Sequence, residues 1–172
     1  EKSKYEEYED KIKRATGFDR LAGKKYIREV ADEVRAGLIE AGIPEQLITV
    51  TSRRKAEVTV YDKVEIRKKH TFEEILDLLG LKIIINCPAD SKYMEWAQIY
   101  LHEKFDLSKC QVEDSITHPR PSGWQAISYD NARTQEGKTL EMQLMTLKMY
   151  ENEKFLAVRQ THWYYALQRE LP

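Results

Sequence analysis

The run LKIIINC at Leu81–Cys87 constrains the fold of this chain more than any other segment. Only Lys82 and Asn86 interrupt its apolar side chains. A nearly continuous apolar strand of this kind is typical of a sheet interior, where both faces of the strand are covered. The chain must therefore place apolar layers on both sides of a sheet, and its 172 residues are enough to build one such core.

The first third of the chain predicts a long helix. Apolar residues recur there at four-residue spacing, and Gly42 followed by Pro44 ends the pattern. These apolar residues are Tyr26, Val30, Val34 and Leu38. The sequence TFEE at 71–74 has the spacing of a capping box and predicts a short helix. Two further helices are expected, one at Ser91–Phe105 and one from Leu147 onward.

Four other segments predict strands by their apolar alternation. They are Leu47–Ser52, Gln111–Thr117, Ala126–Arg133 and Thr139–Thr146. The last two flank Thr134–Lys138, whose Gly137 suits a hairpin turn. The segment Ala56–Lys69 fits helical and strand patterns equally, so periodicity leaves it open. Helices followed by strands mixed with helices indicate an α+β domain with a mixed sheet of about five strands, flanked by helices.

Composition excludes several classes of protein. The 28 Lys and Arg residues nearly balance the 29 Asp and Glu residues, which argues against a protein that binds bulk nucleic acid through its phosphates. No apolar run approaches the ~20 residues that a membrane span requires. Cys87 and Cys110 are too few for a disulfide scaffold or a four-cysteine zinc site. We expect action in the cytoplasm without a membrane partner, while a longer parent protein could be delivered or secreted.

Two carboxylates stand in apolar surroundings. Asp77 interrupts the run ILDLL, where a carboxylate is costly unless it is paired with a lysine, held by local backbone or bound to a metal. In LEMQL at 140–144, alternation places Glu141 and Gln143 on the face opposite the apolar residues, which is also typical of a solvated strand face. Two carboxylates on neighbouring strand ends could together hold Mg²⁺ beside a nucleotide.

Cations and a constrained loop could complete such a site. A basic cluster follows the strand at Leu47–Ser52, and it is either a solvated face or a set of phosphate contacts. It comprises Arg53, Arg54, Lys55, Lys63, Arg67, Lys68 and Lys69. The loop HPRPSGWQ at 118–125 is stiffened by two prolines and presents Arg120 and Trp124. An indole beside a guanidinium could stack a base, although a loop Trp more often packs against its own domain.

Five segments, taken in order, resemble motifs of the synthetase domain of the RelA/SpoT family, the ATP-dependent pyrophosphokinases that make alarmones. They are TSRRK at 51–55 with Thr59 and Lys63, DLLGLKII at 77–84, PRPSGWQAI at 119–127, LEMQLMT at 140–146 and HW at 162–163. The resemblance is to small and toxic alarmone synthetases, which consist of this domain alone. It implies a nucleotidyltransferase-like synthetase fold over residues 1–172, with a helical part at 1–45 and a nucleotide-binding core at 46–172. It also implies that Ala56–Lys69 is helical.

The resemblance further implies a reaction, in which the β,γ-pyrophosphate of ATP moves to the 3′-hydroxyl of a purine nucleotide, as in the stringent response. The residues implied to bind ATP are Arg53, Lys55, Thr59 and Lys63. Those implied to bind the acceptor nucleotide are Arg120, Ser122, Trp124 and Gln143. The implied catalytic residues are Asp77, which would bind Mg²⁺, and Glu141, which would share the metal or polarise the 3′-hydroxyl.

The chain departs from the family pattern mainly in its acceptor half. Ser122, Ser128 and Met145 stand where the family has Asn, His and Arg, while Lys82 replaces an Arg and Trp124 replaces a Tyr. Three functions therefore stay open: a pyrophosphokinase of purine nucleotides that could act as a toxin, a toxin that pyrophosphorylates the 3′ end of tRNA, and an inactive nucleotide-binding domain. The expected partners are ATP, a purine nucleotide or tRNA, and an antitoxin or immunity protein.

Overall fold

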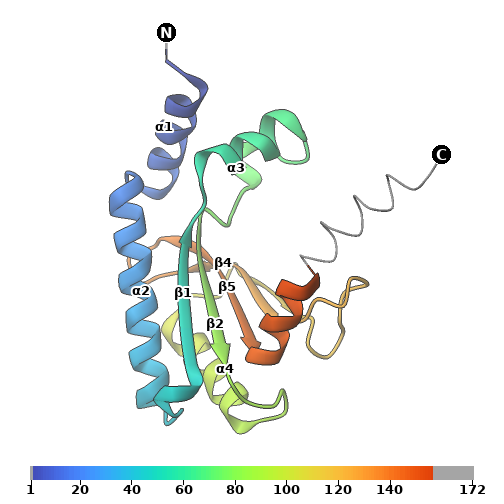
Figure 1. Cartoon of the computed structure of the whole chain (residues 1–172). Coiled ribbons are helices and arrows are strands. Elements are labelled where there is room, and N and C mark those ends of the chain that lie inside the picture. Colours follow the sequence, from blue (N-terminus) through green and yellow to red (C-terminus); the bar gives the residue numbers. More distant parts are fainter. Residues whose placement is uncertain (1, 157–172) are drawn as a thin grey trace, which may run out of the picture.

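The computed structural model describes residues 2–156 (Figure 1). Its helices and strands are α1 (Lys4–Thr16), α2 (Arg20–Glu40), β1 (Ile48–Arg54), α3 (Glu57–Tyr61), β2 (Leu79–Ile85), α4 (Lys92–Lys104), β3 (Gln111–Asp114), β4 (Ile127–Arg133) and β5 (Thr139–Thr146). Residues 147–156 are also helical, as expected for the segment after Leu147. The predicted HW segment at 162–163 lies outside the described residues.

The strands form a five-stranded sheet in the order β1-β2-β5-β4-β3. Strands β2 and β5 are parallel and the other neighbours are antiparallel, so the sheet is mixed, which confirms the predicted α+β class. The apolar run predicted at Leu81–Cys87 lies in β2, which starts and ends two residues earlier. Because β2 pairs on both edges and its residues are buried on both faces, a nearly continuous apolar sequence is what this position requires.

One face of the sheet carries the main apolar core. Helices α2 and α4 cover this face, and α2 runs alongside β1 in Figure 1. The helical side chains in this core include Ile27, Val34 and Leu38 of α2 and Met94, Ala97 and Leu101 of α4. The period of four residues in α2 thus turns one stripe of the helix to the sheet, as the sequence predicted.

The segment that periodicity left open is helical. Helix α3 covers Glu57–Tyr61 and continues as a π-helical turn at Asp62–Ile66, so the helix ends three residues before Lys69. It packs against α1 through a second apolar cluster. The buried members of this cluster are Tyr8, Ile12, Val60, Ile75 and Leu78. The short helix predicted by the capping box is the 3₁₀ turn at Phe72–Glu74.

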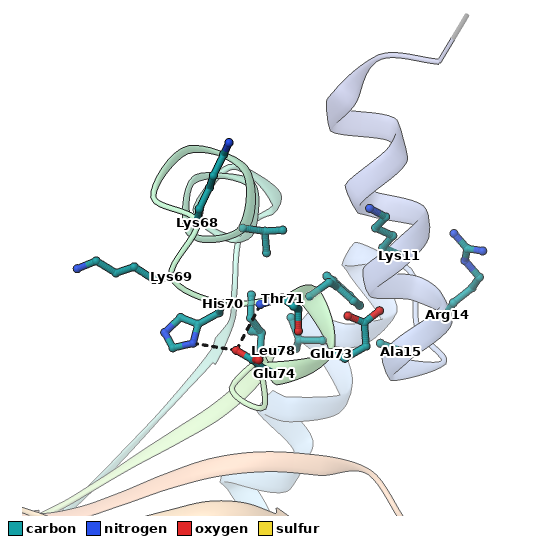
Figure 2. A pocket seen from close by; sticks show the side chains of 13 residues that line it. Lys11, Arg14, Ala15, Lys68, Lys69, His70, Thr71, Glu73, Glu74 and Leu78 are labelled. Atoms are coloured by element: carbon teal, nitrogen blue, oxygen red, sulfur yellow. Dashed lines mark hydrogen bonds and ion pairs between the residues drawn. The ribbon is translucent and has the colours of Figure 1, made fainter.

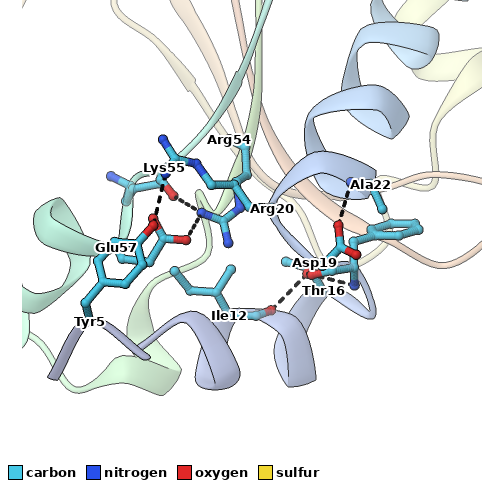
Figure 3. A network of polar contacts seen from close by, with 10 residues as sticks. Tyr5, Ile12, Thr16, Asp19, Arg20, Ala22, Arg54, Lys55 and Glu57 are labelled. Carbon is cyan, nitrogen blue, oxygen red and sulfur yellow. Dashed lines mark hydrogen bonds and ion pairs between the residues drawn. The ribbon is translucent and has the colours of Figure 1, made fainter. Parts of the chain in front are cut away.

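A buried ion pair joins β1 to α3. The guanidinium of Arg54 donates to the Glu57 carboxylate and to the carbonyl oxygen of Lys55, next to α1 and α2 (Figure 3). Both charged side chains are almost fully enclosed. Truncating one partner would leave the other charge buried without compensation, so this pair holds the turn from strand to helix in place. Arg54 therefore has a structural role, although it belongs to the basic cluster of the sequence.

Strand β3 is shorter than predicted, and strand β4 is irregular. Strand β3 ends at Asp114, whose carboxylate accepts from the backbone N–H groups of Ile116 and Thr117 and so starts a turn. Strand β4 contains a β-bulge between Tyr129 and Ala132, and Asn131 there has φ 66°. Among residues 2–156, no helix is both long and apolar enough to cross a membrane.

Candidate active site

The face of the sheet opposite α2 and α4 carries polar side chains. The strand register places Arg53 of β1, Gly80 of β2 and Glu141 of β5 in one row across three strands. In the next row lie Lys82 and Gln143. Since Gly80 has no side chain, it leaves open space between Arg53 and Glu141, and all three line a hollow of about 250 Å³. The alternation predicted for 140–144 is confirmed.

Asp77 lies at one end of this face, just before β2. Its Oδ2 atom accepts from Lys55 Nζ at 2.6 Å and from Arg53 Nη2 at 3.4 Å. The side chain of Lys55 is only 6% exposed, and its backbone N–H donates to the Leu78 carbonyl at 2.8 Å. Among the alternatives that the sequence left open for Asp77, the structure shows a lysine partner. We call Arg53, Lys55 and Lys63, gathered around Asp77, the cation cluster.

Opposing effects set the charges of the cation cluster. Burial favours the neutral acid of Asp77, but the hydrogen bond and charge of Lys55, with Lys63 and Arg53, outweigh it and hold the Asp77 pKa below its usual value. Burial, together with the nearby charge of Lys63, lowers the pKa of Lys55 despite its contact with Asp77. Lys63 therefore lies close to both groups, so the cluster carries three cations for one carboxylate.

Glu141 lies in a different electrostatic setting. Burial raises its pKa, although a hydrogen bond from Gln143 Nε2 at 2.8 Å opposes this effect. The charges of Asp77 and Asp130 raise the pKa of Glu141 further, and Asp130 lines a hollow together with Glu141. A carboxylate with a raised pKa accepts a proton more readily, so Glu141 is suited to act as a general base.

The donor set at Asp77 and Glu141 fits Mg²⁺. Mg²⁺ takes oxygen ligands and is commonly held by one or two carboxylates together with substrate phosphates. Both contacts of Asp77 with cations use Oδ2. Within the part of the chain that the structure describes, no cluster of three His, Cys, Asp or Glu side chains forms a complete metal cage. Asp77 and Glu141 therefore suit a cation that arrives with phosphate oxygens of its own.

A second hollow, of about 450 Å³, adjoins Glu141, and we call it the loop pocket. It is lined by Arg120, Ser122, Trp124, Ser128, Asp130, Glu141, Gln143, Glu153 and Leu156. The structure thus brings all four predicted acceptor residues to one place. Ser122 lies exposed in the 118–125 loop, and its Oγ accepts from the Trp124 backbone N–H at 3.4 Å.

Trp124 is half-buried, whereas the loop sequence suggested an indole held out from the domain. It packs on the small cluster formed by Ala126, Met145 and Met149, and its Nε1–H donates to Glu153 Oε1 at 3.1 Å. The Arg120 guanidinium lies 4.6 Å from the ring centroid. The 147–156 helix supplies the partners that the sequence of the loop could not reveal, and Trp124 both packs and borders the pocket.

The remaining predicted residues fall in two places. Thr59 is exposed on α3, one turn before Lys63, and so lies on the helix that carries the cluster. The later basic residues do not extend the cluster. Arg67 pairs with Asp62, and Lys68 and Lys69 line a separate hollow of about 1130 Å³ beside α1 (Figure 2). That hollow is larger than the loop pocket but contains neither Asp77 nor Glu141.

Sequence reasoning missed two carboxylates of the loop pocket, Asp130 and Glu153. Asp130 precedes the bulge residue Asn131, and two consecutive polar residues inside a predicted strand were the available signal. Glu153 pairs with Lys82 Nζ at 2.7 Å from the 147–156 helix. A lysine on the polar face of β2 is expected to have an ion-pair partner, but the sequence does not indicate which carboxylate this partner is.

The fold and these two hollows define a class of protein, an α+β domain whose mixed sheet presents cations and carboxylates on one open face. A family model described as the region found in RelA / SpoT proteins matches residues 52–170, well over half of the chain. The chain therefore belongs to the RelA/SpoT family.

The curated relatives are much longer proteins. The chain is 28% identical over 162 residues to a guanosine-3′,5′-bis(diphosphate) 3′-pyrophosphohydrolase of Aquifex aeolicus, covering 93% of this chain and 22% of that protein. It is 27% identical over 141 residues to a GTP pyrophosphokinase of Photobacterium angustum, covering 81% of this chain and 17% of that protein. The chain thus spans about a fifth of the length of these relatives.

Two solved structures share the fold. Small alarmone synthetase 1 from Bacillus subtilis aligns with a TM-score of 0.60 at 18% identity, over 83% of this chain and 76% of that chain. The complex of the Type VI effector Tas1 with its immunity protein aligns with a TM-score of 0.52 at 19% identity, over 98% of this chain and 85% of the other. Both confirm the predicted synthetase-type fold.

Proposed function

We propose that this chain is an ATP-dependent pyrophosphokinase that transfers the β,γ-pyrophosphate of ATP to the 3′-hydroxyl of a purine nucleotide. The observation that carries the proposal is the cation cluster around Asp77, whose Arg53 lies in the same strand row as Glu141 on an open sheet face. Three cations around one carboxylate suit a polyphosphate with its cation, and a half-buried Glu141 suits activation of a hydroxyl. Membership of the RelA/SpoT family supports the same reaction.

The cation cluster would bind the donor. Lys55 is already aimed at Asp77 by its burial and by the backbone bond to Leu78, so it needs little reorganisation when phosphates arrive. Arg53 and Lys63 approach the same carboxylate from β1 and from the turn that follows α3. Asp77 would hold Mg²⁺, which neutralises the phosphate charge when bound, and Glu141 would act on the 3′-hydroxyl of the acceptor. Thr59, on the same helix as Lys63, would contribute a hydroxyl to this site.

The chemical step requires no covalent intermediate on the protein. The 3′-oxygen of the acceptor attacks the β-phosphorus of ATP and forms a new oxygen–phosphorus bond. The bond between the β-phosphorus and the oxygen that bridges it to the α-phosphorus breaks, so AMP leaves with that oxygen. The hydroxyl proton passes to Glu141 and from there to solvent. Positioning and charge stabilisation carry most of such a transfer.

The loop pocket would bind the acceptor. Trp124 offers an aromatic plane beside Arg120, and Gln143 orients Glu141 through its amide. A base stacked on Trp124 would place its sugar toward Glu141, because both residues line the same pocket. Ser122 would contribute a hydroxyl at the mouth of the pocket.

The fold shared with an effector bound to its immunity protein favours a toxin as one form of this activity. We accordingly include an immunity protein among the proposed partners. Expression of the chain with and without catalytic substitutions in a sensitive host tests this part of the proposal. Growth arrest by the unaltered chain alone is the expected result.

The activity itself is tested by incubating the protein with Mg²⁺, labelled ATP and individual acceptors, followed by chromatography of the products. We expect AMP and a 3′-pyrophosphorylated nucleotide in equal amounts. A tRNA acceptor is included as a separate arm. Label found only on tRNA would favour the toxin that acts on its 3′ end, and binding of ATP without any product would favour the inactive domain.

A further inference from the structure

The loop pocket has the opposite charge balance from the cation cluster. Among residues 2–156, the side chains that line it include one cation, Arg120, and three carboxylates, those of Asp130, Glu141 and Glu153. Glu141 can be set aside, because the proposed function assigns it to the reaction with the 3′-hydroxyl. Of the two that remain, Glu153 is paired with Lys82 of β2, whereas no ion pair of the described residues involves Asp130, which lies in the pocket where the acceptor nucleotide would bind.

Two cations of residues 2–156 that lie at or beside this pocket, Arg120 and Lys82, are already engaged. Arg120 forms two hydrogen bonds to Glu113, from Nε at 3.1 Å and from Nη2 at 2.8 Å. Lys82, on the neighbouring strand β2, is paired with Glu153 at 2.7 Å. An acceptor phosphate would have to displace Glu113 or Glu153 to use either cation. Such an exchange gives little net attraction, because one anion replaces another.

Asp130 lies on the same face of β4 as Ser128, two residues before it, and both line the pocket. Asp130 is half-buried there. Burial, with the charge of Glu113, raises the pKa of Asp130, and the opposing effect of Arg120 is smaller. Asp130 thus faces more nearby negative charge than positive charge. A further anion placed beside it would be repelled.

We infer that the acceptor is a purine nucleotide with a single 5′-phosphate, and that Asp130 and Glu153 reject acceptors with a 5′-triphosphate. This inference rests on the proposed function, since it describes the second substrate of the same site. One phosphate can be accommodated near the rim at Arg120, whereas each added phosphate increases repulsion by the two carboxylates. Rejection by unfavourable charge is a common source of specificity.

The test measures kcat/KM with labelled ATP as donor and a series of acceptors. The series contains the mono-, di- and triphosphates of guanosine and the mono- and diphosphates of adenosine, because ATP itself is the donor. We expect the monophosphate to be preferred over the triphosphate by about tenfold or more. Asp130→Asn and Glu153→Gln should each lower this preference by about threefold to tenfold, mainly by improving KM for the triphosphate.

The matched control is Glu29→Gln, which removes one carboxylate charge from the exposed side of α2. It should leave the preference unchanged, which separates a local effect from a change in net charge. A triphosphate preferred by the unaltered protein, or a preference that neither Asp130→Asn nor Glu153→Gln alters, would overturn the inference.

Failure of the proposed function gives a different result. If no acceptor is pyrophosphorylated, calorimetric titration with guanosine mono- and triphosphate, at saturating non-hydrolysable ATP analogue, still compares the two classes of ligand. Tighter binding of the monophosphate than of the triphosphate, with a smaller difference in Asp130→Asn, would support the charge argument even if the protein has no activity. Equal or tighter binding of the triphosphate, or no binding of the monophosphate, would contradict it.

Discussion

The cation cluster and the loop pocket differ in how they are built and in the sign of their charge. The cation cluster comes from one short stretch of chain, in which β1 leads directly into α3, and its carboxylate follows soon after. The loop pocket is assembled from the 118–125 loop, the bulged strand β4, strand β5 and the 147–156 helix. One short segment can thus bring several positive charges together. The loop pocket instead combines carboxylates from several elements, which allows it to select among acceptor nucleotides.

The largest expected effect comes from replacing the two predicted catalytic carboxylates, Asp77 in the cation cluster and Glu141 beside the loop pocket. Asp77→Asn and Glu141→Gln should each lower kcat by about 100- to 10,000-fold, since both remove charge that acts in the transition state. Steady-state kinetics checks this, with circular dichroism to confirm the fold. Turnover near that of the unaltered protein in either variant would remove that residue from the proposed mechanism.

A second effect is specific to the loop pocket. Trp124→Ala should raise the acceptor KM by about ten- to a hundredfold with little change in the KM for ATP, because a stacked base contributes about 1–3 kcal/mol. Trp124→Tyr keeps an aromatic face but cannot reproduce the indole N–H bond to Glu153, so an intermediate KM is expected. Thermal melts run in parallel separate stacking from packing. A large fall in Tm with an unchanged acceptor KM would show that Trp124 only packs.

A third measurement tests whether the cation cluster and the loop pocket bind different ligands. Lys63→Ala and Arg53→Ala should weaken binding of a non-hydrolysable ATP analogue by about tenfold, as expected for a lost contact to a charged group. Arg120→Ala should leave this affinity nearly unchanged. Calorimetry measures all three, with Lys24→Ala on the exposed side of α2 as the control for charge. An equal loss of affinity for the ATP analogue in all three site variants would mean that the cation cluster and the loop pocket are not separate binding sites.

The smallest effect concerns acid stability and the cation cluster alone. The Asp77 pKa lies below its usual value in the folded protein, so its charge stabilises the fold fully above about pH 3.8 and progressively less as the pH falls further. The Tm of the unaltered protein should therefore exceed that of Asp77→Asn near neutral pH, and the difference should shrink at about pH 3. An exposed control, Asp32→Asn, should show a much smaller difference. A Tm difference for Asp77→Asn that is independent of pH would contradict the role of its charge.

The sequence by itself determined the elements and much of the cation cluster. The near-continuous apolar run required an interior strand, and alternation at 140–144 assigned Glu141 and Gln143 to the polar face. Both follow from local periodicity, which is a property of the segment's own sequence and does not depend on its place in the fold. The costly position of Asp77 likewise called for a cation, and Lys55 supplies it from a nearby part of the chain.

Only the tertiary structure decided the character of the loop pocket. Asp130 borders it together with residues of β5, the 118–125 loop and the 147–156 helix, and Glu153 bonds to Lys82 and Trp124 across about 70 and 30 positions of sequence. Such contacts depend on how the 147–156 helix and the 118–125 loop meet above the sheet, which no local pattern encodes. The charge of a pocket is a sum over residues that folding brings together, so its sign became apparent only when those residues were placed side by side.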